Sequence, residues 1–263
     1  EKALLRWELV QLEATPLDEV QKHRSADLVF GSVPDDAQRL TSTLSIDPVI
    51  TRWHSTGLYL PPGELVEVTV PAEVVNLGFR VQVSGHTDDL GHLDTWLRMP
   101  RVSRSFPLDA SGIQVASPFG GALYVDVGSE PVRAPSFEIT FIGVVQAPFF
   151  ILDKTTDEAW FNEFRKRPAP YAELVSPNLS ISLPSHFIRD LEGLTDLMNF
   201  WDGAVALQDQ VGMHGHLRTN AERFNVDVQI SAGWLHAGYP IQGPVAAANE
   251  LVDFQGLLER GSW

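Results

Sequence analysis

The segment Val66-Glu67-Val68-Thr69-Val70 decides the fold class, because an apolar side chain recurs at every second position. Successive side chains of a β-strand point to opposite faces of the sheet, so this period of two predicts a half-buried strand. The same alternation recurs at Phe79–Val83, Leu123–Val127 and Phe137–Phe141, with turn-rich segments between the runs. Four such strands favour a β-sandwich over residues 45–147.

The residues before the sandwich carry a different pattern. Leucines and Trp7 are interspersed with charged residues over positions 1–24, which predicts a helix that is broken at Pro16. We therefore expect residues 1–44 to form a helical lead-in and a linker.

The residues after Pro148 mix helical and strand patterns. Thr155 and Glu158 have the spacing of a capping box, which predicts a helix from Thr155 to about Arg167. Strands interleaved with helices indicate a second, α/β or α+β domain over residues 148–263, so the expected fold class is mixed α and β. The further predicted elements are a strand at Leu179–Leu183, a helix from Ser185 that includes Trp201, a strand at Val226–Ile230, and a helix from Pro244 through Leu258.

The composition limits the partners of this chain. Its 34 acidic and 19 basic residues give a net charge of −15, which would repel the phosphate backbone, so we expect no nucleic-acid partner. Cysteine is absent, which excludes disulfides and thiolate metal ligands. No apolar run approaches the ~20 residues that a membrane-spanning helix needs, so no membrane span is expected. These features fit an exported bacterial protein and a cytosolic one alike.

Two histidine motifs could bind a metal. The segment Gly85–His92 holds two histidines and two aspartates, but its Gly, Thr and Asp content favours a hydrogen-bonded turn. His214 and His216 would share one face of a strand and could chelate an ion. No carboxylate or third ligand adjoins them, so a structural role is favoured for these two as well.

The segment Gln229–Ile241 is a candidate binding region, because it joins a predicted strand to an aromatic, glycine-rich stretch. Glycine lets another backbone approach closely, as a peptide substrate would when it pairs with the edge of a sheet. A tight loop without a ligand explains the same residues equally well.

Several catalytic motifs are missing from the sequence. It contains no Gly-x-Ser-x-Gly elbow for a serine nucleophile and no Gly-x-Gly-x-x-Gly or Walker loop for phosphate. It also contains no His-Glu-x-x-His, so we assign no catalytic residue and no metal ligand within the chain.

Taken in order, a series of segments resembles the enhancin-like metallopeptidases, peptidase family M60, which include viral enhancins and bacterial mucin-degrading proteases. The resemblance covers the chain from about residue 27 to its end. The matching segments are Trp53–Glu64, Gly85–Asp88, Trp96–Val102, Phe106–Leu108, Ala116–Gly121, Phe200–Asp202, Glu222–Phe224 and Gly233–Ile241.

The resemblance implies an N-terminal β-sandwich followed by the N-terminal α+β part of a gluzincin-type metallopeptidase domain. In the family, a helix with His-Glu-x-x-His supplies two zinc ligands and the general base. By this resemblance, that helix is expected C-terminal to Trp263. We therefore expect Zn²⁺ in the full-length protein only, and an inactive fragment.

The resemblance also implies a substrate and its binding residues. By analogy of position with the substrate-pairing edge strand of gluzincins, Trp234, His236, Gly238 and Tyr239 are the expected substrate-binding residues. The implied activity is a secreted or cell-surface zinc endopeptidase that acts on O-glycosylated, mucin-like proteins and binds their glycans. The alternative is a non-catalytic carbohydrate- or glycoprotein-binding module of a cell-surface protein, because some relatives have lost the zinc motif.

Overall fold

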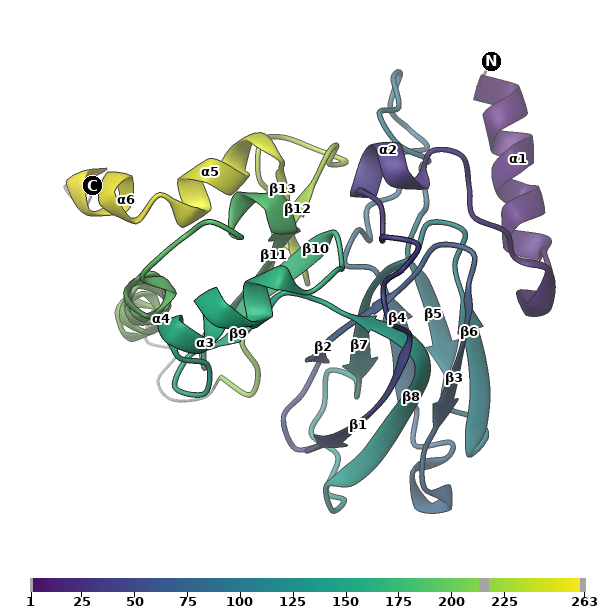
Figure 1. The fold of residues 1–263 in the computed structure, drawn as a ribbon, viewed down its shortest axis with the longest axis horizontal. Helices are drawn as coiled ribbons and strands as arrows, with labels where there is room; N and C mark the ends of the chain where they lie inside the picture. Colours follow the sequence, from purple (N-terminus) through teal and green to yellow (C-terminus); the bar gives the residue numbers. More distant parts are fainter. Residues whose placement is uncertain (1, 213–217, 261–263) are drawn as a thin grey trace. The chain divides into compact units, whose positions relative to one another are not determined.

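A computed structural model of the chain describes residues 2–212 and 218–260. The chain divides between Gln146 and Ala147 into two compact units, each of which is described by itself (Figure 1). The motif of His214 and His216 lies outside the described residues, as does the C-terminal Gly261-Ser262-Trp263.

Unit 1 is an antiparallel sheet of eight strands that folds into two layers. The strands are β1 Leu40–Ile46, β2 Trp53–Leu60, β3 Leu65–Thr69, β4 Arg80–Val83, β5 Arg104–Pro107, β6 Gly112–Ala116, β7 Gly121–Asp126 and β8 Phe137–Gln146. Their order is β5-β4-β7-β2-β8-β3-β6, and β1 also pairs with β8. Strand β8 pairs with β2 through Val145 and Gln146 and with β1 and β3 through earlier residues, so it connects the two layers.

The core of unit 1 lies between these layers and confirms the predicted β-sandwich. Val81 and Val125 from one layer and Val68 and Phe141 from the other belong to one buried apolar cluster. Strand β1 begins at Leu40, inside the segment assigned to a linker, because its Ser and Thr residues obscure the alternation of apolar side chains.

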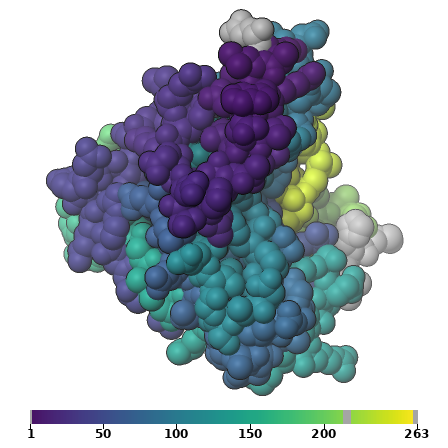
Figure 2. All heavy atoms as spheres, turned by 90° about the vertical axis from the view of Figure 1, so that its right-hand side faces the viewer, coloured from purple at the N-terminus to yellow at the C-terminus, as the bar shows by residue number. Residues whose placement is uncertain are grey.

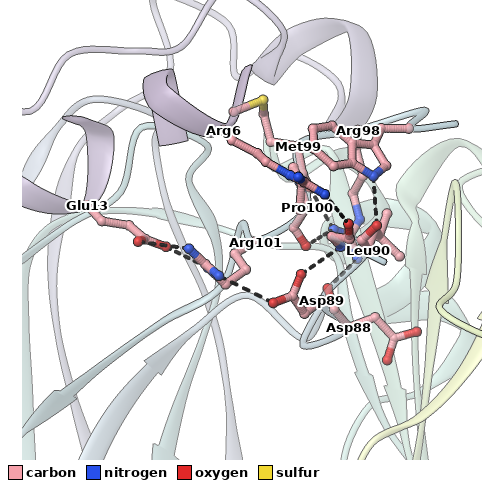
Figure 3. A network of polar contacts seen from close by, with 11 residues as sticks. Arg6, Glu13, Asp88, Asp89, Leu90, Arg98, Met99, Pro100 and Arg101 are labelled. Carbon is pink, nitrogen blue, oxygen red and sulfur yellow. Dashed lines mark hydrogen bonds and ion pairs between the residues drawn. The ribbon is translucent and has the colours of Figure 1, made fainter. Parts of the chain in front are cut away.

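Helix α1, Lys2–Ala14, lies on the surface of unit 1 and is held mainly by polar contacts (Figures 2 and 3). Arg101 donates to both carboxylate oxygens of Glu13 at 2.7 and 3.0 Å, and Arg6 donates to the carbonyl of Gly91 at 3.0 Å. Leu9 is the one buried side chain among those described in this helix. The short helices of unit 1 are η1 Leu17–Glu19, α2 Ala26–Phe30 and η2 Ala72–Val74.

The loop that receives α1 is fixed from inside by Arg98 (Figure 3). Its guanidinium is buried and donates to the carbonyls of Met99 at 2.8 Å, Pro100 at 3.1 Å and Asp88 at 3.2 Å. Because the guanidinium is planar and donates to Asp88 as well as to Met99 and Pro100, it fixes the distance between these two parts of the loop. The loop is therefore a rigid platform for α1.

Unit 2 is a mixed five-stranded sheet in the order β13-β12-β11-β10-β9. Strands β9 and β10 are parallel, β10 and β11 are antiparallel, and β11, β12 and β13 are parallel to one another. The elements in chain order are β9 Phe149–Ile151, α3 Asp157–Asn162, η3 Phe164–Lys166, β10 Tyr171–Val175, β11 Leu179–Pro184, η4 Ser185–Phe187, α4 Leu194–Val211, β12 Glu222–Asp227, β13 Ile241–Pro244, α5 Ala246–Val252 and α6 Phe254–Arg260.

The helices of unit 2 start and end at other residues than predicted. The cap of α3 is Thr156, whose hydroxyl accepts the N–H of Ala159 at 3.1 Å, whereas Thr155 accepts the N–H of Ile151. Helix α4 begins after Gly193, not at Ser185. The predicted last helix is two helices that are separated at Asp253. Within residues 2–212 and 218–260, no helix is both long and apolar enough to cross a membrane.

Candidate functional site

The sheet of unit 2 has an apolar face and a polar face. Strand register places Glu173, Ser182, Asn225 and Gln242 in one row across β10, β11, β12 and β13. All four side chains are buried, and Asn225 Nδ2 donates to Gln242 Oε1 at 2.8 Å. Side chains at alternate positions, such as Ile181, belong to the apolar core that packs against helices α3 to α6. The row therefore gives one face of this sheet a hydrogen-bonding surface.

A buried ion pair anchors the row. The guanidinium of Arg223, on β12, donates to the carboxylate of Glu173 on β10. The side chains are 3% and 5% exposed. Taking two charges out of water costs several kcal/mol per ion unless they are paired and hydrogen-bonded, so each residue needs its partner.

The segment that connects β12 to β13, residues 228–240, exposes two large apolar side chains. Trp234 is 58% exposed and Leu235 is 49% exposed. Gly233 has φ +62°, a left-handed conformation that favours glycine. A Cβ on Gly243 would lie 3.2 Å from Leu235 Cδ1, so the glycine in β13 leaves room for the Leu235 side chain.

His236 fastens this segment to the edge strand β13. Its backbone forms an antiparallel bridge with Gln242 through N···O distances of 3.2 and 3.4 Å. Its Nδ1 lies 3.2 Å from the carbonyl oxygen of Ala237, and its Nε2 lies 3.2 Å from Ser231 Oγ. A carbonyl oxygen only accepts, so the hydrogen bond requires a proton on Nδ1, and the neutral ring accepts from Ser231 at Nε2.

The structure brings the predicted binding residues Trp234, His236, Gly238 and Tyr239 together in one loop beside β13. Trp234 is exposed, and His236 and Tyr239 are half-buried. Their contact with a substrate stays a prediction.

In the strand predicted at Val226–Ile230, apolar residues alternate with Asp227 and Gln229, which predicts a half-exposed position such as a sheet edge. That prediction was wrong. Strand β12 ends at Asp227, not at Ile230, and lies between β11 and β13, so it is not a sheet edge. The side chain of Asp227 is 0% exposed, although it was expected on a solvent-facing side. Alternation alone cannot separate a polar face that is buried from one that faces water.

Zinc does not fit the residues that the structure describes. Among residues 2–212 and 218–260, no group of three His, Asp or Glu side chains is arranged to hold a metal ion. In the Gly85–His92 motif, His86 Nδ1 lies 2.7 Å from Ser84 Oγ, and Asp89 accepts the N–H of Gly91 at 2.8 Å. Asp89 also pairs with Arg101 at 3.3 Å. We therefore assign no ligand and no catalytic step to these side chains.

Sequence reasoning missed the buried polar row. One signal was present, because Glu173 interrupts the apolar run Tyr171-Ala172-Glu173-Leu174-Val175. A carboxylate within a buried strand predicts a partner of opposite charge. The identity of that partner, Arg223, depends on strand order, which no local pattern reveals.

Two family models match the chain. Residues 35–141 match the N-terminal domain of M60-like peptidases, and residues 143–263 match peptidase M60, enhancin and enhancin-like. Among curated proteins, the TRPM8 channel-associated factor homolog of Xenopus laevis is 36% identical over 230 residues, which is 84% of this chain and 25% of that protein. The homolog of Danio rerio is 36% identical over 80% of this chain and 23% of its own length. The chain thus spans about a quarter of these relatives.

Solved structures share the fold at low sequence identity. A conserved protein from Bacillus anthracis matches with a TM-score of 0.66 and 15% identity, over 84% of this chain and 48% of that one. The IMPa metallopeptidase of Pseudomonas aeruginosa in complex with T-antigen matches with a TM-score of 0.59 and 18% identity, over 86% and 30% of the two chains. The M60 catalytic domain of Clostridium perfringens ZmpC, in complex with the sialyl T antigen, matches with a TM-score of 0.61 and 13% identity, over 81% of this chain and 50% of that one.

Proposed function

This chain belongs to the enhancin and enhancin-like peptidase M60 family, and from that membership we propose that it supplies substrate-binding residues to a zinc-dependent endopeptidase. The proposed substrates are O-glycosylated, mucin-like proteins outside the cell, so the full-length protein would be secreted or displayed at the cell surface. Zn²⁺ is its proposed cofactor. Because the described residues do not fit zinc, their proposed part is to bind and orient the substrate.

The observation that carries the proposal is the exposed Trp234 beside β13. Its ring is carried by a loop whose backbone is held by the His236–Gln242 bridge, so less backbone freedom is lost on binding than in a loop without this bridge. An exposed indole offers a flat apolar face on which a sugar ring can stack. The T-antigen complexes of IMPa and ZmpC support a glycan as the ligand class.

Each of the other three loop residues has a proposed part in this site. Gly238 carries no side chain, so a peptide backbone can approach the loop closely at this position. Tyr239 is half-buried in the same loop and supplies a second aromatic side chain. Both ring nitrogens of His236 already have hydrogen-bond partners, so we assign it the positioning of the loop in place of a direct bond to substrate.

Replacement of Trp234 tests the proposal by calorimetry. The 263-residue chain is titrated with a glycopeptide that carries T-antigen and with the same peptide without sugar. We expect the glycopeptide to bind more tightly, and Trp234→Ala to weaken its binding about tenfold, the equivalent of ~1.4 kcal/mol for one stacking contact.

Trp7→Ala is the matched control, because Trp7 is 61% exposed but lies on α1 in unit 1. We expect it to leave glycopeptide affinity unchanged. Equal weakening by both replacements, or equal affinity for peptides with and without sugar, would contradict the proposal.

A second candidate function is a non-catalytic glycan- or glycoprotein-binding module of a cell-surface protein. The observation in its favour is that relatives of higher identity, at 36%, are TRPM8 channel-associated factors and not peptidases by name. Turnover of the glycopeptide by the full-length protein separates the two. Binding that requires Trp234, with no cleavage by the full-length protein loaded with Zn²⁺, selects the binding module.

A further inference from the structure

A pocket lies in unit 2, between α3 and the segment that precedes α4. Its volume is about 460 Å³, and it is lined by Asp157, Trp160, Phe161, Leu191, Glu192 and Gly193. Pockets for small ligands measure roughly 300–1,000 Å³. None of the lining residues belongs to the 228–240 loop, so this pocket goes beyond the proposed function.

The charged side chains that line the pocket are both carboxylates. Asp157 Oδ1 accepts the N–H of Thr195 at 3.1 Å, which fixes this carboxylate at the first turn of α4. Glu192 is exposed and lies two residues before the start of α4. Negative charges around a hollow with apolar walls attract a cation more strongly than the same charges on an open surface.

The apolar walls suit the stem of a long side chain. Phe161 is 45% exposed, and the guanidinium carbon of Arg165 lies 3.7 Å from its ring centroid, so this ring already takes part in a cation–π contact. Leu191 adds aliphatic surface. A Cβ on Gly193 would meet no atom within 4 Å, so the turn leaves space for a ligand.

Trp160 forms an inner wall of the pocket. Its side chain is 1% exposed, and its indole nitrogen is buried away from solvent. Trp160 therefore offers a ligand apolar contact and no hydrogen bond, and its indole resonance can report whether the pocket is occupied.

We propose that this pocket binds a lysine side chain of a peptide ligand. The ammonium group is neutralised by Asp157 and Glu192, and the methylenes pack against Phe161 and Leu191. A cation is attracted by both carboxylates, whereas a neutral sugar is not, which is why we favour a cation over a sugar.

Nuclear magnetic resonance on the ¹⁵N-labelled chain tests the proposal through the indole resonance of Trp160, assigned with Trp160→Phe. The probes are acetyl-Gly-Lys-Gly-amide, its norleucine analogue, butylammonium and methyl galactoside. We expect the lysine peptide to shift the resonance with saturation, and the norleucine peptide to bind about fivefold or more weakly, as expected for loss of a partly desolvated charge pair. Butylammonium that binds as tightly as the lysine peptide would overturn the assignment to a peptide. Tighter binding of the galactoside would overturn the assignment to a cation.

Four variants locate the binding. Asp157→Asn keeps an acceptor for Thr195, Glu192→Gln keeps the side-chain length, and Phe161→Leu keeps apolar contact without the aromatic ring. Each should weaken the lysine peptide about two- to fivefold, the range for one exposed charge pair or for part of an apolar contact. Glu158→Gln, also on α3 but outside the pocket lining, is the matched control and should have no effect. Equal weakening by Glu158→Gln would show general attraction to an acidic chain and overturn the proposal, as would no weakening by the other three.

Discussion

At the scale of single residues, the polar face of the second sheet depends on one ion pair. Glu173 and Arg223 are buried on β10 and β12, and β11 lies between their strands. The pair therefore spans a strand and links two elements that are far apart in the sequence. Replacement of such a pair by hydrophobic residues of similar volume often leaves stability unchanged or higher. Removal of one partner alone is strongly destabilising, because the other charge is then buried without its counter-charge.

Glu173→Gln should lower the free energy of unfolding by about 3–5 kcal/mol, because it leaves the guanidinium of Arg223 buried without its counter-charge. Thermal or urea unfolding followed by circular dichroism measures the change. The double replacement Glu173→Met with Arg223→Met should recover part of the loss, since no buried charge remains.

Glu163→Gln is the control for that measurement. The side chain of Glu163 is 69% exposed and pairs with Arg167 at 3.2 Å, and an ion pair whose carboxylate stays in water is worth about 0.2–1 kcal/mol. Equal effects of the two single replacements would contradict the assignment of a buried, mutually dependent pair.

At the scale of elements, α1 is attached by charge more than by apolar burial. Leu4, Trp7 and Val10 are exposed on the helix, whereas Lys2 and Arg6 lie over the ring of Trp96 at 5.3 and 5.7 Å. Contacts between exposed charges weaken when salt screens them. The helix is therefore the element of unit 1 whose attachment should respond most to ionic strength.

Arg101→Gln should loosen α1 without unfolding the sandwich, because it removes the bidentate pair with Glu13 and the contact with Asp89. Hydrogen exchange of the α1 amides should become several-fold faster, as expected for a loss of about 1 kcal/mol, while the amides of β3 and β8 keep their protection. Salt at about 1 M should loosen α1 in the unmodified chain in the same way. The control is Arg80→Gln, which removes a surface arginine that bonds Ser105 on the sandwich. Loss of protection throughout unit 1 in Arg101→Gln would contradict this role.

The sequence was sufficient to predict elements whose pattern is local. Strand β3 alternates buried Val66 and Val68 with exposed Glu67, which is the pattern of a half-buried strand. Strand β11 was found for the same reason, yet Ser180 and Ser182 are buried as well, because both faces of that strand are covered. Local pattern thus locates a strand but does not reveal how many of its faces are buried.

The remaining differences have a physical cause in long-range packing. The sequence predicted one helix from Ser185. Gly193 instead has a left-handed conformation, φ +70°, and is the N-cap residue at which a separate helix, α4, begins. For the candidate site, composition located the loop around Trp234 and His236. The buried partners Arg223 and Gln242 depended on the order of parallel strands, which is set by contacts between distant segments.

At the scale of the whole molecule, the chain consists of two units whose sheets share no strand. Pro148 lies between β8, the last strand of unit 1, and β9, the first of unit 2. Every strand partner of β1 to β8 lies before residue 147. Unit 1 therefore contains all the pairing that its own fold requires.

A chain of residues 1–146 should fold on its own, with dispersed amide resonances and one cooperative melting transition. A chain of residues 1–136 lacks β8 and should not fold, because β1 and β3 then lose strand pairing and the core loses Phe137, Ile139 and Phe141. A cooperative transition in the shorter chain, or none in the longer one, would contradict the assignment of unit 1 as a self-contained sandwich.

The position of β8 also has a consequence for synthesis on the ribosome. Its partners β1, β2 and β3 leave the exit tunnel early, whereas Phe137–Gln146 is the last part of unit 1 to be translated. Until it emerges, the nascent chain displays unpaired strand edges and apolar faces, which are the surfaces that aggregate and that chaperones bind. A pause in translation after β8 has left the exit tunnel would give the sandwich time to close before unit 2 appears, whereas a pause while β8 is still inside the tunnel would prolong the exposed state.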